Sequence, residues 1–526
     1  MRQLTVRSLA ALRTSETGLL VLALCVGAGA GGGAIAFRWL ISTFTHVLSG
    51  HADYAGLGRV SNPHVPFLGV WFLVLAPVIA GLIYGPLVHA FAREARGHGV
   101  PEVMYAVARN KGRIKPQVAA VKALASALCI GGGGSVGREG PIVQIGSALG
   151  STLGRLTAVD EERTRVLVAC GAAGGIAATF NAPLAGVFFA MELILRDFAA
   201  RSFGMVVLSS VSASVIGRSA FGDTAFLHLR GFHITDPTQY AWFALLGLIA
   251  GVTGVLFTRV LYLVEDVCDW AWRGPEWLRP AVGGLLLGGL LLAVPQMYGV
   301  GYPVLDRGVV GGYTVAVLVG LLAAKVLATS LTIGIGGSGG VFAPSLFVGA
   351  MLGAAYGSVL HDALPQSAGT IGAYGLIGMG AVFAGSARAP ITAVVILFEL
   401  TGEYTIILPL MTAIVLATGV SHVLSRDTVY TAKLRRRGVD LDATPDPLDG
   451  LILDAAIRPA ADDATIDNRR TIALDAPLSA AIEAMRDVQT DLVVVDHQQR
   501  AVGRLTPRAM RNAIPRGAAT TENREG

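Results

Sequence analysis

The sequence predicts an all-α membrane protein of tilted and broken helices, followed by a small soluble α/β domain. Hydrophobic residues make up 53% of the 526 residues and charged residues only 15%, whereas soluble domains carry about 25% charged residues. Apolar stretches recur to about residue 425, and several are interrupted by Gly or Pro or are shorter than the ~20 residues of a straight membrane span. Beyond that point 16 of the 36 acidic residues occur, between Asp427 and Glu525.

The charge and cysteine patterns exclude several classes of protein. The net charge of +5 comes from basic residues in short runs between apolar spans, so we expect contact with a lipid bilayer and no nucleic-acid partner. The cysteines lie in or beside apolar segments without metal-ligand spacing, which indicates buried thiols rather than disulfides or a metal site. They are Cys25, Cys129, Cys170 and Cys268. Since the sequence also has no P-loop or dinucleotide motif, we expect no cofactor and no enzyme.

Clusters of basic residues predict the orientation in a cell membrane. Arg and Lys gather in the N-terminal tail, between Arg93 and Lys115, and between Arg426 and Arg437, so these regions and both termini are expected to be cytoplasmic. The apolar stretch from Gly18 follows a basic lead, as in a signal peptide. We interpret it as an uncleaved first helix, because long apolar segments keep recurring. The expected order is a tail at 1–15, a multi-pass membrane domain at 16–425, a linker at 426–449, a small domain at 450–515 and a tail at 516–526.

The small C-terminal domain has its own pattern. The sequence predicts a strand at Arg470–Asp475, a helix at Pro477–Asp487 and a strand at Asp491–Asp496. A turn at Gly503–Pro507 then leads into a second helix. The alternative is a disordered acidic tail, but Leu492–Val495 is apolar enough to favour a folded domain.

The membrane domain contains an internal repeat. Lys122–Gly131 matches Lys325–Gly334, 203 positions later, and the register holds without gaps to Gly154 and Gly357. Asn181–Pro183 and Glu192 match Arg388–Pro390 and Glu399, 207 positions later. The halves span roughly 16–217 and 240–425. Repeats with matching broken segments point to a transport site at the repeat interface; the alternative is a duplicated bundle with no site.

Three Gly-rich breaks carry the chemistry, at Gly97–Glu102, Gly137–Pro141 and Gly340–Pro344. Each contains a Pro and leads into an apolar segment, which is typical of a helix N-terminus. A helix start presents unpaired N–H groups and a partial positive charge. Three converging starts would therefore form a site for an anion rather than for a cation.

In order and spacing these motifs resemble the signature set of the CLC family of chloride channels and proton-coupled chloride exchangers, over roughly residues 16 to 433. The resemblance implies a bundle of broken helices in two inverted-topology repeats, and a homodimer with one pore per subunit. It implies transport of chloride, either through a voltage- or pH-gated channel or by proton/chloride antiport. Another anion such as nitrate or fluoride is the alternative substrate.

The resemblance also implies roles for single residues. Glu139 corresponds to the gating glutamate: a carboxylate beside helix starts occupies an anion's place, and protonation removes its charge and lets it swing away. The alternative from the residues alone is an acid that stabilises the start of its own helix. The implied anion contacts are Gly97, His98, Arg138, Gly140, the amides of Val341 and Phe342, and the hydroxyl of Tyr430.

Two positions depart from the family pattern. His98 replaces a serine, so either an imidazole contacts the anion, or the ring points to the cytoplasm and only the backbone N–H remains in the site. Leu193 occupies the place of the internal glutamate of many proton-coupled members and cannot relay a proton. Glu139 and Glu192 are the remaining candidates for a proton pathway. Because Glu192 and Glu399 are symmetric in the repeat, we interpret them first as structural acids at helix ends.

Two further segments carry recognisable sequence patterns. The C-terminal domain resembles a single CBS motif, and one copy favours a dimer contact over an adenine-nucleotide site. Gly336–Gly339 also fits the Gly-x-Ser-Gly pattern of rhomboid-like intramembrane proteases, with Ser338 as the nucleophile. The repeat gives Ser135 as the counterpart of Ser338, which favours a structural turn.

Overall fold

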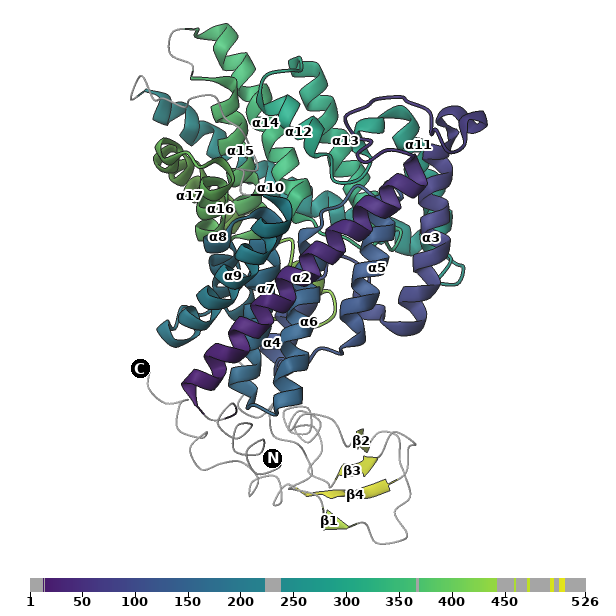
Figure 1. Ribbon diagram of the computed structural model, residues 1–526, viewed down its shortest axis with the longest axis vertical. Coiled ribbons are helices and arrows are strands. Elements are labelled where there is room, and N and C mark those ends of the chain that lie inside the picture. Colours follow the sequence, from purple (N-terminus) through teal and green to yellow (C-terminus); the bar gives the residue numbers. More distant parts are fainter. Residues whose placement is uncertain are drawn as a thin grey trace. The chain divides into compact units, whose positions relative to one another are not determined.

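The computed structural model describes residue 13, residues 15–222, 238–365 and 369–441, and the strand segments 458–459, 471–473, 492–495 and 501–506. The chain forms two compact units, Met1–Val439 and Asp440–Gly526. The first unit is helical, and the second contains a small sheet (Figure 1). The predicted fold class is confirmed.

The helices of the first unit follow the same order twice. The first half contains α2 (Glu16–Ser49), α3 (Phe72–Phe91), α4 (Val100–Arg109), α5 (Gln117–Gly131), α6 (Glu139–Thr157), α7 (Glu161–Phe180), α8 (Pro183–Phe189) and α9 (Ala200–Phe221). The second half contains α10 (Gln239–Ala271), α11 (Arg279–Ala293), α12 (Tyr302–Val309), α13 (Val315–Gly334), α14 (Phe342–Ala363), α15 (Ile371–Ala387), α16 (Pro390–Thr401) and α17 (Ile407–Leu424). Helix α18 (Thr431–Arg435) follows.

Short helical turns connect these elements. They are the 3₁₀ turns η1 (Pro66–Trp71), η2 (Arg93–Ala95), η4 (Pro295–Met297) and η5 (Tyr404–Ile406), and the π-helical turn η3 (Ala190–Leu195) that continues α8.

The helix lengths fit a membrane protein with broken spans. Among the described residues, seven helices are long and apolar enough to cross a membrane. Helices α4 and α12 have only 10 and 8 residues, or about 15 Å and less, which is half of a hydrocarbon core of about 30 Å. Their irregular ends are therefore acceptable only where protein surrounds them.

The two halves interlock through equivalent helices. Helix α3 packs on α11 and α8 packs on α16 (Figure 1). Helix α6 also meets α14. At the centre, Gly137 N donates to Gly340 O at 2.7 Å, and Gly340 N donates to Gly137 O at 2.6 Å. Gly137 and Gly340 are equivalent in the repeat, and reciprocal contacts between equivalent residues require a two-fold relation. The halves are therefore related by a pseudo-two-fold axis near this pair.

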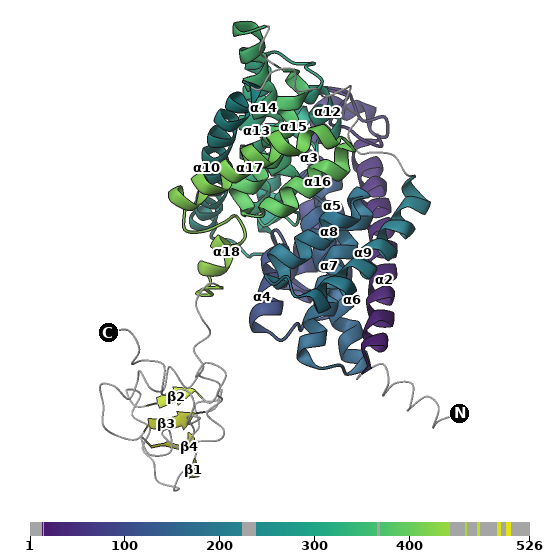
Figure 2. The same ribbon diagram turned by 90° about the vertical axis from the view of Figure 1, so that its left-hand side faces the viewer.

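Close helix packing inside each half depends on glycine. A Cβ atom built on Gly171 of α7 would lie 2.0 Å from Gly146 O of α6. In the equivalent pair of the second half, a Cβ atom built on Gly378 of α15 would lie 2.3 Å from Gly349 O of α14. Figure 2 shows α6 and α7 side by side, as are α14 and α15. Small residues at such crossings let helix backbones approach closely where no hydrophobic effect drives association.

The second unit contains a four-stranded sheet in the order β1–β4–β3–β2. Its strands are β1 (Arg458–Pro459), β2 (Thr471–Ala473), β3 (Leu492–Val495) and β4 (Ala501–Leu505). Strand β2 is parallel to β3, whereas β4 is antiparallel to both β3 and β1. Both predicted strands are present, but the prediction of a turn at Gly503 is wrong. Gly503 pairs with Val494, because the buried strand β3 takes β4 as its antiparallel neighbour. The helices expected at Pro477–Asp487 and after Pro507 lie outside the described residues.

The contact between α6 and α7 yields a test of stability. The substitution Gly171→Ala adds a methyl group against the backbone of α6, so we expect a loss of about 1–3 kcal/mol, measured as a lower unfolding temperature in detergent. Gly289→Ala in α11 is the matched control, because a Cβ there meets nothing within 4 Å. Equal melting temperatures for the two variants would contradict this account of the packing.

Candidate functional site

The three Gly-rich breaks meet at one place. Gly97 N donates to Gly337 O at 3.0 Å and Gly339 N donates to Gly97 O at 3.3 Å, beside the reciprocal pair of Gly137 and Gly340. A Cβ atom on Gly140 would lie 2.0 Å from His98 O. Glycine is therefore required for the approach of these loops. They lead into α4, α6 and α14, so the three helix starts converge as the sequence predicts.

The side chain of Glu139 lies where these loops meet. Glu139 is the first residue of α6 and its side chain is buried. One carboxylate oxygen, Oε2, accepts a hydrogen bond from the amide of Ala343 at 3.3 Å. The other, Oε1, accepts from the hydroxyl of Tyr302 at 2.9 Å. Both donors belong to the second half, so the carboxylate occupies the start of α14.

The start of α14 offers further donors. Within the described part of the chain, the amides of Val341 and Phe342 donate no hydrogen bond. The first amides of a helix have no partner inside the helix and attract negative groups. The ring of Phe342 packs against Phe180 and Phe383, with centroid distances of 5.6 and 4.5 Å. These free amides therefore lie among apolar walls.

Tyr430 is also buried and has a free hydroxyl. Its backbone is fixed by a bond from Tyr430 N to Thr428 Oγ1 at 3.2 Å and by the neighbouring bond from Val429 N to Ser386 O at 2.8 Å. The side chain is 1% exposed, and its hydroxyl makes no hydrogen bond to another described residue. A buried hydroxyl without a protein partner is available to a ligand.

The side chain of His98, in the first break, is buried without hydrogen-bond partners among the described residues. It is 2% exposed, its ring lies edge-on to Tyr262 at 6.1 Å, and neither ring nitrogen has a hydrogen-bond partner among the described residues. The ring is therefore buried in the protein and does not point into solvent. Buried imidazole nitrogens are normally hydrogen-bonded, so a ligand or water is the expected partner.

Two polar pockets border these residues. One contains Arg138, whose guanidinium carbon lies 5.1 Å from the centre of the Tyr302 ring. That pocket is lined by Arg38, Asp53, Tyr54, Arg138, Tyr298 and Tyr302, among others. The second pocket is lined by Arg93, Arg96, Glu265, Asp266, Asp269, Lys433, Arg436 and Arg437. Five of its eight residues are basic, and ion pairs join Lys433 to Glu265 and Arg436 to Asp266.

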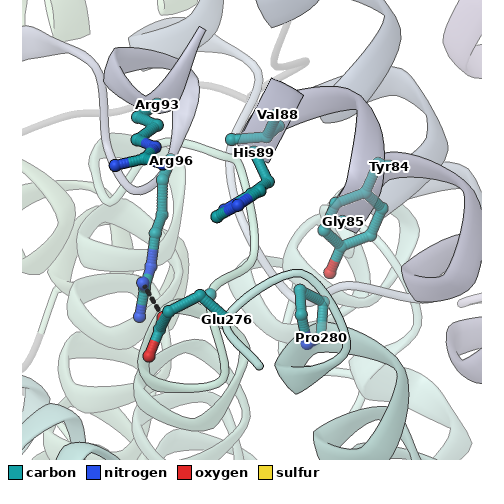
Figure 3. Close-up of a pocket in the computed structure, with 9 residues that line it drawn as sticks. Tyr84, Gly85, Val88, His89, Arg93, Arg96, Glu276 and Pro280 are labelled. Carbon is teal, nitrogen blue, oxygen red and sulfur yellow. Dashed lines mark hydrogen bonds and ion pairs between the residues drawn. The ribbon is translucent and has the colours of Figure 1, made fainter. Parts of the chain in front are cut away.

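The pocket in Figure 3 is a different one. It is lined mainly by residues of α3, including Tyr84 and His89, by the turn that follows α3, and by Glu276 and Pro280. Arg96 donates to Glu276 at 2.6 Å across it. None of the residues predicted to contact the anion lines this pocket. Arg96 lies immediately before Gly97 and also lines the second polar pocket, beside Lys433.

Two buried lysines, which mark the repeat in the sequence, support the breaks. Lys122 Nζ donates to Ala95 O at 2.9 Å and to Gly97 O at 2.7 Å. Its repeat partner Lys325 donates to Ser135 Oγ and to two carbonyl oxygens of residues 299 and 300, at 2.9, 3.3 and 2.8 Å. Both lysines are 0% exposed. They supply donors to loop carbonyls that no helix satisfies.

A fourth break was missed. Gly299–Pro303 is the repeat counterpart of Gly97–Pro101, 202 positions later, with the same Gly-x-Gly-x-Pro pattern. Gly99 and Gly301 both have positive φ angles, of 84° and 91°. Extending the repeat register to the first motif would have found this break. It places Tyr302 at the start of α12, against Glu139.

Glu192 and Glu399 form a second reciprocal pair of contacts. Glu192 accepts hydrogen bonds from the amides of Ile391 and Thr392 at the start of α16, at 3.1 and 2.8 Å. Glu399 accepts from the amides of Leu184 and Ala185 at the start of α8, at 2.9 and 2.6 Å. Each acid therefore caps the equivalent helix of the other half. This geometry matches the structural interpretation of both residues.

Ser338 has a structural environment as well. Its hydroxyl donates to Ala95 O at 2.7 Å and lies 2.8 Å from the hydroxyl of Ser126. Neither partner is a base that could activate a serine nucleophile. The site therefore does not resemble that of an intramembrane serine protease.

The chain is also similar to known proteins. Residues 80–422 match the family model described as voltage gated chloride channel. The chain belongs to the CLC family. Like other CLC proteins, it is a multi-pass membrane protein of a family of channels and transporters.

Three CLC relatives illustrate the similarity. A ClcB-like chloride channel protein of Ralstonia nicotianae is 33% identical over 80% of this chain and 98% of its own length. The H⁺/Cl⁻ exchange transporter ClcA of Vibrio parahaemolyticus is 36% identical over 70% of this chain and 80% of its own. The crystal structure of a slow cyanobacterial Cl⁻/H⁺ antiporter superimposes with a TM-score of 0.70 at 26% identity, covering 80% of this chain and 97% of the other.

The reciprocal caps of this CLC protein can be tested. Glu399→Ala leaves the amides of Leu184 and Ala185 without a partner, and losing a helix cap costs about 0.5–2 kcal/mol. We expect a matching fall in the unfolding temperature. Glu162→Ala, at the exposed start of α7, should change stability by less than about 0.5 kcal/mol. A control as unstable as Glu399→Ala would refute the capping role.

Proposed function

We propose that this protein carries chloride across the membrane through the meeting point of α4, α6 and α14, with the side chain of Glu139 as the gate. The observation that carries the proposal is the hydrogen bond from the Ala343 amide to the Glu139 carboxylate. The carboxylate is itself an anion held at a helix start, where negative charge is favoured. A chloride ion would bind there once Glu139 is protonated and moves away.

The remaining anion contacts are groups that have no protein partner. These groups are the amides of Val341 and Phe342, the hydroxyl of Tyr430 and the ring of His98, and all four residues are buried. Backbone groups of Gly97, Arg138 and Gly140 border the same place. The basic pocket beside Lys433 would collect anions at the entrance, because clustered positive charge raises the local anion concentration.

Two modes of transport are compatible with this site, and different observations favour them. Relatives named as H⁺/Cl⁻ exchangers support proton-coupled exchange. Leu193 favours a passive channel, because a buried leucine cannot relay a proton. In an exchanger, Glu139 and Glu192 are the candidate proton carriers, although Glu192 caps α16 in this structure.

The resemblance to CLC proteins supports further features of the proposal. The protein would form a homodimer with one pore in each subunit. Both termini would face the cytoplasm. The basic residues at Arg93–Lys115 and Arg426–Arg437 support that orientation. The small domain at 450–515 would contribute a dimer contact rather than an adenine-nucleotide site.

The deciding experiment is chloride efflux from proteoliposomes of the purified protein, with the membrane potential clamped by an ionophore and the external pH recorded at the same time. Efflux with stoichiometric proton uptake identifies an exchanger, despite Leu193. Efflux with a constant external pH identifies a channel. No chloride efflux above that of protein-free liposomes would refute the proposed function.

The gate has its own test in the same assay. We expect Glu139→Ala to retain chloride flux but to lose its dependence on pH, because no carboxylate remains to be protonated. The wild-type protein, measured between pH 4 and 8, is the reference, and the range begins at the ordinary carboxyl pKa of about 4. A variant with the full pH dependence of the wild type would remove Glu139 from the gate.

His98 is tested through selectivity. We expect His98→Ser to change the relative rates for chloride, nitrate, bromide and fluoride, since a hydroxyl replaces an imidazole beside the anion. The measurement is efflux of each anion from matched liposomes. Identical selectivity in both proteins would show that only the backbone at this position contacts the anion.

A further inference from the structure

The fourth break brings a hydroxyl onto the gate. Tyr302 donates to Oε1 of Glu139 at 2.9 Å, while Ala343 N donates to Oε2 at 3.3 Å. Each oxygen of the buried carboxylate therefore has a donor from the second half. The hydrogen bond from Ala343 is the longer of the two, and its donor is a backbone amide that stays in place. Tyr302 therefore supplies the side-chain donor on which the position of the carboxylate depends.

Tyr302 is itself held firmly. It begins α12 immediately after Gly301, whose positive φ of 91° sets the turn. The carbonyl groups of Gly299 and Val300, the two residues before Gly301, accept hydrogen bonds from the buried Lys325. The guanidinium of Arg138 covers the Tyr302 ring at 5.1 Å, a cation–π contact that favours this ring position. The hydroxyl is therefore placed by rigid neighbours.

The arrangement occurs only once in the repeat. The counterpart of Glu139 is Phe342, and the counterpart of Tyr302 is Val100. Neither counterpart carries a polar side chain. The contact between Tyr302 and Glu139 is thus an addition to the pseudo-symmetric framework and not a consequence of it.

The other charged and titratable groups that face Glu139 come from four neighbouring segments. Arg138 lies beside it, Tyr302 begins α12, Lys325 belongs to α13, and Tyr430 precedes α18. The first turn of α14 adds backbone amides but no titratable side chain. A substitution that removes only the Tyr302 hydroxyl leaves Arg138, Lys325 and Tyr430 in place.

We propose that the hydroxyl of Tyr302 is a latch, a positioning group that holds the ionised Glu139 side chain at the start of α14 and releases it on protonation. The proposal rests on the proposed role of Glu139 as the gate. A hydrogen bond to a carboxylate is about twice as strong as one between neutral groups. The latch therefore favours the closed, ionised gate over the protonated one and sets the pH at which the pore opens.

The test is the pH dependence of chloride efflux for Tyr302→Phe, with the pH changed equally on both sides of the membrane. The phenylalanine ring keeps its packing and the cation–π contact with Arg138 but cannot donate to Glu139. Because the ionised carboxylate loses a donor, it accepts a proton more readily, and we expect the midpoint of acid activation to rise by about one pH unit.

Two controls separate a latch from a general structural effect. Tyr298 lines the same pocket, but its hydroxyl donates to Gly131 O at 2.6 Å, so Tyr298→Phe should keep the wild-type midpoint. In a Glu139→Ala background, Tyr302→Phe should have no further effect on the pH profile, because the latch then has nothing to hold. A shift that persists in that background would overturn the proposal.

A second variant covers the case in which Tyr302→Phe does not fold. Incorporation of 3-fluorotyrosine at position 302 keeps the side-chain shape but makes the hydroxyl a stronger donor, so the midpoint should move to lower pH. A wild-type midpoint in the variant, together with a Glu139→Ala protein that has lost its pH dependence, would overturn the latch and leave the gate intact. A Glu139→Ala protein that keeps its pH dependence would overturn both.

Discussion

The backbone between broken helices must be hydrogen-bonded inside the protein, and the reciprocal pair of Gly137 and Gly340 is where this structure meets that demand. In a membrane no water is available to irregular backbone, so each loop has to find its partners in another loop. Two hydrogen bonds join the halves here, and Gly97 adds two more with Gly337 and Gly339. The helix starts converge because their preceding loops pair with one another.

The buried lysines complete that accounting. Lys122 and Lys325 donate to further loop carbonyl groups, and to Gly97 O, which also accepts from Gly339 N. Each lysine does so for the loop before a short helix. They also place two amino groups close to a site built for negative charge. The same two side chains therefore support the loops and favour a negative charge nearby, whereas the donors proposed to contact the anion have no protein partner among the described residues.

Much of this arrangement could be predicted from the sequence, because the repeat register and the three Gly-rich motifs are visible as spacing. The contact of Tyr302 with Glu139 could not, since it joins residues 163 positions apart that share no motif. The burial of the His98 ring depends on packing against Tyr262, which no local pattern indicates. The sequence predicts a turn at Gly503, where the structure has a strand, because a glycine suggests a bend until the partner strand is known.

The reciprocal caps have a consequence for the origin of the fold. Glu192 binds the start of α16 and Glu399 the start of α8, so each half supplies what the other needs at the same position. Such contacts are self-complementary and would form equally well between two identical copies of one half. A single-half ancestor could therefore have assembled as a symmetric pair, and gene fusion would have preserved the interface. Asymmetric features such as Tyr302 and Glu139 then mark what diverged after the duplication.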